Sequence, residues 1–326
     1  MLTSKKVKEY AKKCGADIAG IASMDRFEGA PKQMDPRYIF PDAKAMIVMG
    51  FRIPRGCFRG IEEGTYFANY CSFGYYHINL VRAMDTLRDV TIFLEDEGYE
   101  AVPYDNTSVR LGCDAGRAVS PEKPRPDVFV HFRIAAFAAG LGEIGYSKVF
   151  LTPEFGPRQR FALILTDAPL EPDPLFKGGL CDRCMQCAKE CSGNAISRTK
   201  TVKIKVAGKT CEWGELDEVK CAGAYEGGIT ETNPFLPENL REEINRLLKE
   251  APKDDWQAQA AYSSKVWNFI RDKVPYNRAA WESYHHPAPI EGARGCMRAC
   301  MIHLEEQGKL KNKFKEPFRR GKAWKL

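Results

Sequence analysis

The spacing of apolar residues in the first half of the chain switches between a helical and a strand pattern. Residues 81–97 carry apolar side chains at every third or fourth position and are followed by Gly98, which predicts a helix. Residues 45–51 and 161–166 are continuous apolar runs of strand length. The same reasoning places further helices at residues 4–14 and 134–141 and further strands at residues 18–22 and 99–104. This alternation predicts a layered α/β unit with a buried sheet.

The second half of the chain begins after three prolines, at positions 169, 172 and 174, which interrupt regular structure. Residues 201–210 alternate with period two, as in a hairpin. Helices are expected near residues 237–249, 255–272 and 277–284. We therefore divide the chain into a first domain at residues 1–173, a second domain at residues 174–305 with a helical insertion at about 201–292, and a tail at residues 306–326.

The composition is that of a protein with two packed domains: 326 residues, 44% hydrophobic, with a formal net charge of +6. Much of the positive charge lies between Lys309 and Lys325. Such a tail could dock an acidic electron donor or an RNA, or simply be solvated, but no stripe of aromatic and basic residues indicates nucleic-acid binding. No apolar run reaches the roughly 18 residues of a membrane span, and the first residues resemble an amphipathic helix rather than a signal peptide. We expect a cytoplasmic protein without a membrane partner.

The most specific chemical signal is the run of Cys181, Cys184, Cys187 and Cys191. Its C-x2-C-x2-C-x3-C spacing is that of bacterial [4Fe–4S] ferredoxins, in which the fourth cysteine ligates a second cluster. A zinc site or a set of buried free cysteines is the alternative, and both fit this spacing poorly. In a cytoplasmic chain, cysteines more often bind metal than form disulfides. The run therefore predicts electron transfer through oxygen-sensitive clusters, which favours an anaerobic setting.

Two clusters need eight ligands, so four more cysteines are required. Cys296 and Cys300 repeat the x3 spacing, and Cys211 and Cys221 are the other cysteines in this half. By the cross-over of ferredoxins, the first cluster takes Cys181, Cys184, Cys187 and Cys300, and the second takes Cys191, Cys211, Cys221 and Cys296. Cys211 is also compatible with an ordinary strand residue. The remaining cysteines, which we interpret as small buried residues, are Cys14, Cys57, Cys71 and Cys113.

Two glycine-rich segments precede the cysteine run, Ala139-Gly-Leu-Gly-Glu-Ile-Gly145 and Thr152-Pro-Glu-Phe-Gly-Pro157. Glycines at this density let the backbone approach a large planar ligand closely, or form a plain tight turn. Together with Thr166-Asp-Ala-Pro-Leu170, these segments resemble the corrinoid-dependent iron–sulfur reductases, the superfamily of epoxyqueuosine reductases and reductive dehalogenases. The resemblance extends from about residue 11 to residue 300.

The resemblance implies a nitroreductase-like α/β domain that binds cobalamin, followed by a ferredoxin-like domain with two [4Fe–4S] clusters. Similar proteins hold the corrinoid base-off, partly through the backbone of the glycine-rich segments. Carried over by motif position, the cofactor-binding residues are Gly140, Leu141, Gly142, Gly145, Ser147 and Thr152. The chain has no counterpart of the tRNA-binding helical repeats or of the long substrate-pocket insertion, so neither a tRNA substrate nor organohalide respiration is expected.

Two looser matches indicate candidate catalytic residues. Gly74-Tyr-Tyr-His77 resembles the D-Y-H string of the epoxyqueuosine branch, and Pro103-Tyr-Asp105 resembles a string whose aspartate is a proton donor. This resemblance makes Asp105 the candidate acid and Tyr76 its neighbour. A turn-capping aspartate and a core tyrosine are the alternatives.

The resemblance implies a soluble oxidoreductase that passes electrons from two [4Fe–4S] clusters to base-off cobalamin and on to a small organic substrate. A low-potential ferredoxin or flavodoxin would supply the electrons, and a homodimer is a common assembly. Two alternatives stay open. The chain could be an electron-transfer protein that reductively activates the corrinoid of a partner, or a flavin-containing iron–sulfur reductase.

Overall fold

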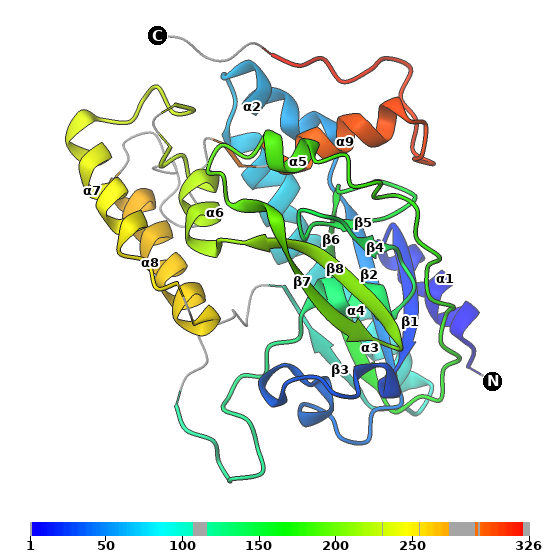
Figure 1. Ribbon diagram of the computed structural model, residues 1–326. Helices are drawn as coiled ribbons and strands as arrows, with labels where there is room; N and C mark the ends of the chain where they lie inside the picture. The colour runs from blue at the N-terminus through cyan, green and yellow to red at the C-terminus, as the bar shows by residue number, and fades with distance from the viewer. Residues whose placement is uncertain are drawn as a thin grey trace.

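A four-stranded antiparallel sheet lies at the centre of the computed structural model, which describes residues 2–106, 116–229, 231–253, 255–273, 291–292 and 294–321. Figure 1 shows its strands in the order β1-β2-β6-β3. Their bounds are Ile18–Ser23 for β1, Ala45–Arg52 for β2, Gln159–Thr166 for β6 and Ala101–Tyr104 for β3. All three pairings are antiparallel, and all four strands had been predicted from their apolar runs. The fold therefore combines helices with a buried sheet, as predicted. Because the sheet is antiparallel, the arrangement is of the α+β type.

The two faces of the sheet belong to two different hydrophobic cores. Because side chains alternate along a strand, Ile47 and Met49 of β2 face one core and Met46 and Val48 face the other. Helices α1 (Ser4–Cys14) and α3 (Ala83–Asp96) cover the first face. Helix α4 (Phe132–Ala138) covers the second, and its run of small residues allows a close approach to the sheet. Burial on both faces explains why β2 is a continuous apolar run.

The helix predicted at residues 81–97 is the second part of a longer helical segment. The segment begins as a π-helix, η5 (Tyr70–Arg82), and continues as α3. The prediction placed the start too late, because η5 contains Gly74 and several polar residues that hide its periodicity. π-helical turns are rare and often lie at functional sites.

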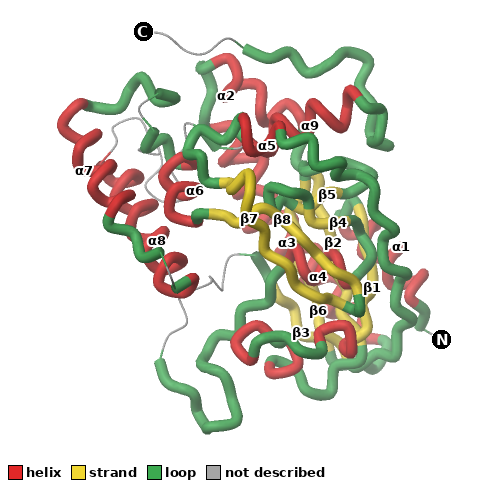
Figure 2. The backbone as a smooth tube through the Cα atoms, viewed as in Figure 1, coloured by secondary structure: helices red, strands yellow, loops and turns green. Residues whose placement is uncertain are grey.

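The second half contributes a long hairpin and a group of three helices. Strands β7 (Ile196–Val206) and β8 (Lys209–Leu216) form the hairpin, which packs through Val206 and Trp213 against the second core of the sheet. Helices α6 (Glu218–Tyr225), α7 (Glu238–Lys249) and α8 (Trp256–Lys273) share a core of their own and lie on the opposite side of the molecule from α1 (Figures 1 and 2). The hairpin, α7 and α8 had been predicted, whereas the helix expected at 277–284 lies outside the described residues.

Two further helices carry cysteines, α5 (Gln186–Lys189) and α9 (Cys296–Glu306). The other short elements include α2 (Arg59–Glu63), β4 (Glu143–Ile144) and β5 (Phe150–Leu151). Helices α5 and α9 lie side by side, although more than a hundred residues separate them in sequence. Met301 of α9 and Phe318 beyond it pack into the first core of the sheet. Within the described residues, no helix combines the length and apolarity needed to cross a membrane.

Candidate metal and cofactor site

Four of the predicted ligands gather where α5 meets α9. We call Cys181, Cys184, Cys187 and Cys300 the first cysteine group. Burial raises the pKa of the Cys300 thiol well above its usual value, and the nearby thiols of Cys187, Cys181, Cys184 and also Cys296 add to this effect. Burial also raises the pKa of Cys187 to about 11, with contributions from Cys181 and Cys184. The structure therefore brings together the four residues predicted to ligate the first cluster.

Three further cysteines form a neighbouring second cysteine group, which consists of Cys191, Cys221 and Cys296. They come from the end of the cysteine run, from α6 and from the first turn of α9. Burial, with contributions from Glu218 and Cys191, raises the pKa of Cys221 to about 12. The pKa of Cys296 is raised by burial and by the thiols of Cys221 and Cys191. Cys191 therefore lies near Cys296, an arrangement that the cross-over of ferredoxins requires, and the assignment of ligands to two clusters stays a prediction.

The chemistry of these two groups fits iron–sulfur clusters. Metal-ligating thiols must be deprotonated, yet burial and crowding oppose the formation of several neighbouring thiolates. A cationic centre removes this conflict by offsetting the negative charge, and metal binding then drives deprotonation. None of the eleven described cysteines forms a disulfide. The residues of both groups would therefore hold thiolate-ligated metal.

The structure does not bring Cys211 to either group. Cys211 lies in β8, paired with Ile204, and packs in the second core of the sheet near Val206 and Trp213. Burial alone raises its pKa to about 11, without a contribution from another thiol. Among the other cysteines, Cys57 and Cys71 are buried in the first core, as predicted. Cys14 packs at its edge, and Cys113 lies outside the described residues.

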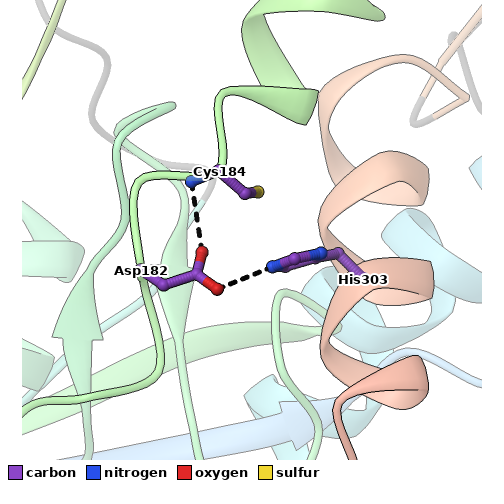
Figure 3. A group of neighbouring side chains, drawn as sticks. All are labelled: Asp182, Cys184 and His303. Carbon is purple, nitrogen blue, oxygen red and sulfur yellow. Dashed lines mark hydrogen bonds and ion pairs between the residues drawn. The ribbon is translucent and has the colours of Figure 1, made fainter.

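An acid–base pair lies at the outer edge of the first cysteine group. Asp182 accepts a hydrogen bond from the backbone of Cys184, and its Oδ2 lies 2.8 Å from Nε2 of His303 on α9 (Figure 3). The ligand atoms of Asp182, Cys184 and His303 lie within 4.8 Å of one another. Burial opposes ionisation of Asp182, but hydrogen bonds from His303 and Gln307 outweigh it and hold the pKa of Asp182 well below its usual value. The pair ties the loop of the first cysteines to the helix that carries Cys300.

Two carboxylate contacts that the sequence prediction missed hold the cysteine segments in place. Glu143, in the first glycine-rich segment, accepts hydrogen bonds from the backbone of Leu180 and Cys181, at 2.7 and 2.6 Å. Arg298 lies between Cys296 and Cys300 on α9 and donates to Glu62 and Glu190, each at 2.8 Å. Glu143 could have been suspected because it sits within a recognised motif. No sequence pattern marks the pair of Arg298 with Glu62, which are 236 residues apart.

The glycine-rich segments form a tightly packed turn beside the first cysteine group. A Cβ at Gly142 would lie 1.9 Å from the carbonyl oxygen of Leu151, and one at Gly140 would lie 2.2 Å from that of Pro174. A Cβ at Gly145 would lie 3.0 Å from the end of the Leu151 side chain, which would have to move by a few tenths of an ångström. Backbone contacts within the chain therefore already explain Gly140 and Gly142. A role in binding a corrinoid stays a prediction for these positions and for Leu141, which lies in the same turn.

Two of the predicted cofactor-binding residues, Ser147 and Thr152, lie outside this turn and contact other parts of the site. The Ser147 side chain lies near the Cys187 thiol and acts to lower its pKa, which places Ser147 beside the first cysteine group. Thr152 is fully buried, where its hydroxyl hydrogen-bonds with Gln159 and accepts from the backbone of Phe155. Ser147 therefore faces the metal side of the site, whereas Thr152 supports the turn.

A cavity of about 1660 Å³ lies beside the second cysteine group. Its walls come from the segment at residues 26–34, from the hairpin β7–β8 and from the facing ends of α7 and α8. Ala195 is part of this wall, and its backbone N–H donates to Sγ of Cys191 at 3.3 Å. His131 and Lys148 also line the cavity. The volume exceeds the roughly 1,000 Å³ of large drug-sized pockets and is sufficient for a macrocycle.

The candidate catalytic residues are next in sequence to two residues that contact Arg160, and Tyr76 itself packs against the first core of the sheet. The Arg160 guanidinium lies 4.2 Å from the ring centre of Tyr75 and donates to Asn106 at 3.1 Å. Tyr75 and Asn106 are the sequence neighbours of Tyr76 and Asp105. The structure therefore brings together the two segments that contain the candidate catalytic residues. Arg133 interacts electrostatically both with Arg160 and with two thiols of the second cysteine group. Burial lowers its pKa, while the charges of Glu218, Cys221 and Cys296 act in the opposite direction.

Comparison with known proteins finds relatives among two kinds of reductase. A tetrachloroethene reductive dehalogenase of Dehalobacter restrictus is 33% identical over 151 residues, which cover 42% of this chain and 23% of the relative. An epoxyqueuosine reductase of Bacillus cereus is 26% identical over 273 residues, which cover 73% of this chain and 59% of the relative. No protein-family model matches the chain.

A solved structure, a catabolic reductive dehalogenase, superposes with a TM-score of 0.50 at 20% identity, over 88% of this chain and 40% of that one. The fold and site thus define a protein of mixed α/β architecture with two groups of neighbouring cysteines. The chain is homologous to reductive dehalogenases and epoxyqueuosine reductases, which confirms the resemblance to the corrinoid-dependent iron–sulfur reductase superfamily. It spans about a quarter of the length of its dehalogenase relatives and less than two thirds of its epoxyqueuosine reductase relatives.

Proposed function

We propose that the protein is a corrinoid-dependent iron–sulfur oxidoreductase that reduces a small organic substrate. The observation that carries this proposal is the crossed arrangement of two cysteine groups next to a macrocycle-sized cavity. Ala195 joins the two sites, because it lines the cavity and donates to Cys191. The homologous reductases support the same class of reaction. A cytoplasmic location and a low-potential ferredoxin or flavodoxin as donor are parts of this proposal.

The proposed cofactors are two iron–sulfur clusters and one cobalamin held base-off. When bound, they would supply one-electron transfer and a strongly reducing metal centre, which side chains cannot provide. The first cysteine group holds one cluster through four thiols. The second group holds the other and lies against the cavity. Within the cavity, Lys148 and Trp213 offer a cation and an aromatic face to the periphery of a corrin.

The chain's own contribution to the reaction is placement of the substrate and delivery of a proton. Asp105 or Tyr76 would donate the proton, since both lie on segments arranged around Arg160. Arg160 positions these segments through Tyr75 and Asn106. Arg133 and Arg160 also make the region cationic, which favours a substrate that gains negative charge during reduction.

The decisive experiment adds cob(II)alamin anaerobically to the cluster-reconstituted protein and records its EPR spectrum. We expect loss of the nitrogen hyperfine splitting that the cobalamin base produces, which reports base-off binding. A spectrum identical to that of free cobalamin would contradict the proposal. His131 needs a control, because its Nδ1 is buried at the cavity without a hydrogen-bond partner among the described residues. Nitrogen splitting that disappears only in His131→Phe would identify this histidine as a lower ligand.

A second experiment tests proton delivery. Asp105→Asn and Tyr76→Phe should leave the base-off spectrum unchanged while one of them lowers the turnover of a reducible substrate by roughly 100-fold or more. Full turnover in both variants would favour the alternative in which the chain reduces the corrinoid of a partner. A visible spectrum of the purified protein with flavin bands and no corrin bands would favour the flavin alternative.

A further inference from the structure

The second cysteine group has three thiols, although a [4Fe–4S] cluster has four iron atoms to ligate. Cys211 is the residue that the sequence places fourth, but it is held far from the group. The base of the hairpin lies at the group, because Leu216 pairs with Ile196 and packs beside Cys191 and Cys296. Cys211 is five positions further along β8, which corresponds to about 16 Å of extended strand. A strand in a paired hairpin cannot fold back over this distance.

A buried carboxylate occupies the neighbourhood of the second group. Oε2 of Glu291 accepts a hydrogen bond from Oγ of Ser192, the residue after Cys191, at 2.6 Å. Oε1 of Glu291 lies 2.8 Å from the point where a Cβ of Gly295 would stand, and Cα of Cys191 lies 3.9 Å from the same point. Since Gly295 immediately precedes Cys296 and Ser192 follows Cys191, the carboxylate lies against the backbone segments that carry two of the three cysteines. Its side chain is 7% exposed.

Two other carboxylates near the cysteines form direct ion pairs. Glu218 pairs with Lys148 at 2.8 Å, and Glu190 pairs with Arg298 and Arg320 at 2.8 and 2.9 Å. Glu291 instead hydrogen-bonds to the hydroxyl of Ser192, and the charges of Arg294 and Arg298 favour its ionised form. A carboxylate oxygen is a competent ligand for iron, and a metal cation would add to the stabilisation that these arginines give the buried anion.

We infer that the Glu291 carboxylate is the fourth ligand of the cluster at the second cysteine group, in place of Cys211. This inference rests on the proposed function only in requiring that the second group holds an iron–sulfur cluster. The cluster then has three iron atoms bound to thiolates and one bound to oxygen. The oxygen-bound iron is the one that leaves first, because a carboxylate is a poorer match for cluster iron than a thiolate.

The test uses the full chain, purified and reconstituted anaerobically with iron and sulfide. Wild type should contain about eight iron atoms per chain. Glu291→Ala and Glu291→Gln should contain about seven and should show the EPR signal of a three-iron cluster in the oxidised state. Glu291→Cys should restore the iron content of wild type, with a reduced-state EPR spectrum that differs from it. Glu291→Gln keeps the shape of the side chain and decides the test if Glu291→Ala does not fold.

The matched controls are Cys211→Ala and Cys113→Ala, of which the second covers a cysteine outside the described residues. Both should retain the iron content and the EPR spectra of wild type. The inference is overturned if either cysteine variant loses iron from the second cluster, if Glu291→Ala and Glu291→Gln retain it, or if wild type itself contains the three-iron form. The cobalamin EPR experiment is independent of this result. Failure of base-off binding with intact iron counts would remove the corrinoid function and leave the ligand assignment standing.

Discussion

The two cysteine groups differ in how their ligands are supplied. Three members of the first group come from one short run, and Cys300 completes a set of four thiols. The second group draws Cys191, Cys221 and Cys296 from three separate segments and has Glu291 beside it. The first group carries the Asp182–His303 pair at its outer edge, whereas the second adjoins the cavity. Ligands that are close in sequence follow from local spacing, but ligands from distant segments depend on how the elements pack.

The prediction with the largest expected effect removes the cluster of the first group alone. Cys300→Ser should remove the cluster of the first group and lower the iron content from about eight to about four atoms per chain. The EPR signal of the second cluster should persist, because its three cysteines are unchanged. Cys57→Ala, a buried cysteine outside both groups, is the control and should retain all the iron. If Cys300→Ser loses the iron of both groups, the two sites are not independent.

A second test concerns the arginine that lies between the groups. Arg298→Ala leaves the buried carboxylate of Glu62 without its closest cationic partner, so we expect the free energy of unfolding to fall by about 3–5 kcal/mol. Arg320→Ala is the matched control, because Arg320 contacts Glu190 from the surface and its loss should cost less than about 1 kcal/mol. Anaerobic denaturant titration measures both values. Equal losses would show that burial does not set the strength of this network.

The smallest expected effect concerns His131, which lines the cavity, and the pH dependence of the free energy of unfolding. Burial lowers the pKa of His131 from 6.5 to about 3. Below pH 6.5 the unfolded chain therefore binds a proton that the folded chain does not, so the free energy of unfolding falls as the pH falls. Between pH 6.5 and about pH 5, this loss is up to about 2 kcal/mol. His131→Gln should show a flatter slope in denaturant titrations. An unchanged slope would assign the acid sensitivity to other groups.

Much of the sheet and of the first cysteine group was predictable. The runs at residues 45–51 and 161–166 are strands because burial on both faces demands continuous apolar sequence. Cys181, Cys184 and Cys187 meet because two-residue spacers leave little freedom. The π-helix at Tyr70–Arg82 was missed, since its polar and glycine residues follow no helical periodicity of 3.6. Arg160 was missed as well, because its partners Tyr75 and Asn106 come from distant segments.

The sequence by itself determined the cysteine spacing that predicts a redox site and which reductases the chain is related to. Thiols at fixed short intervals and glycines at turns are local requirements of chemistry and backbone geometry, so they can be recognised in the sequence. Only the tertiary structure decided which long-range residues join the site. In the tertiary structure Cys211 lies in the second core of the sheet with Trp213, and Glu291 lies beside Cys191 and Cys296. The register of the hairpin and the packing of α9 set these contacts, and both depend on burial across the whole molecule rather than on neighbouring residues.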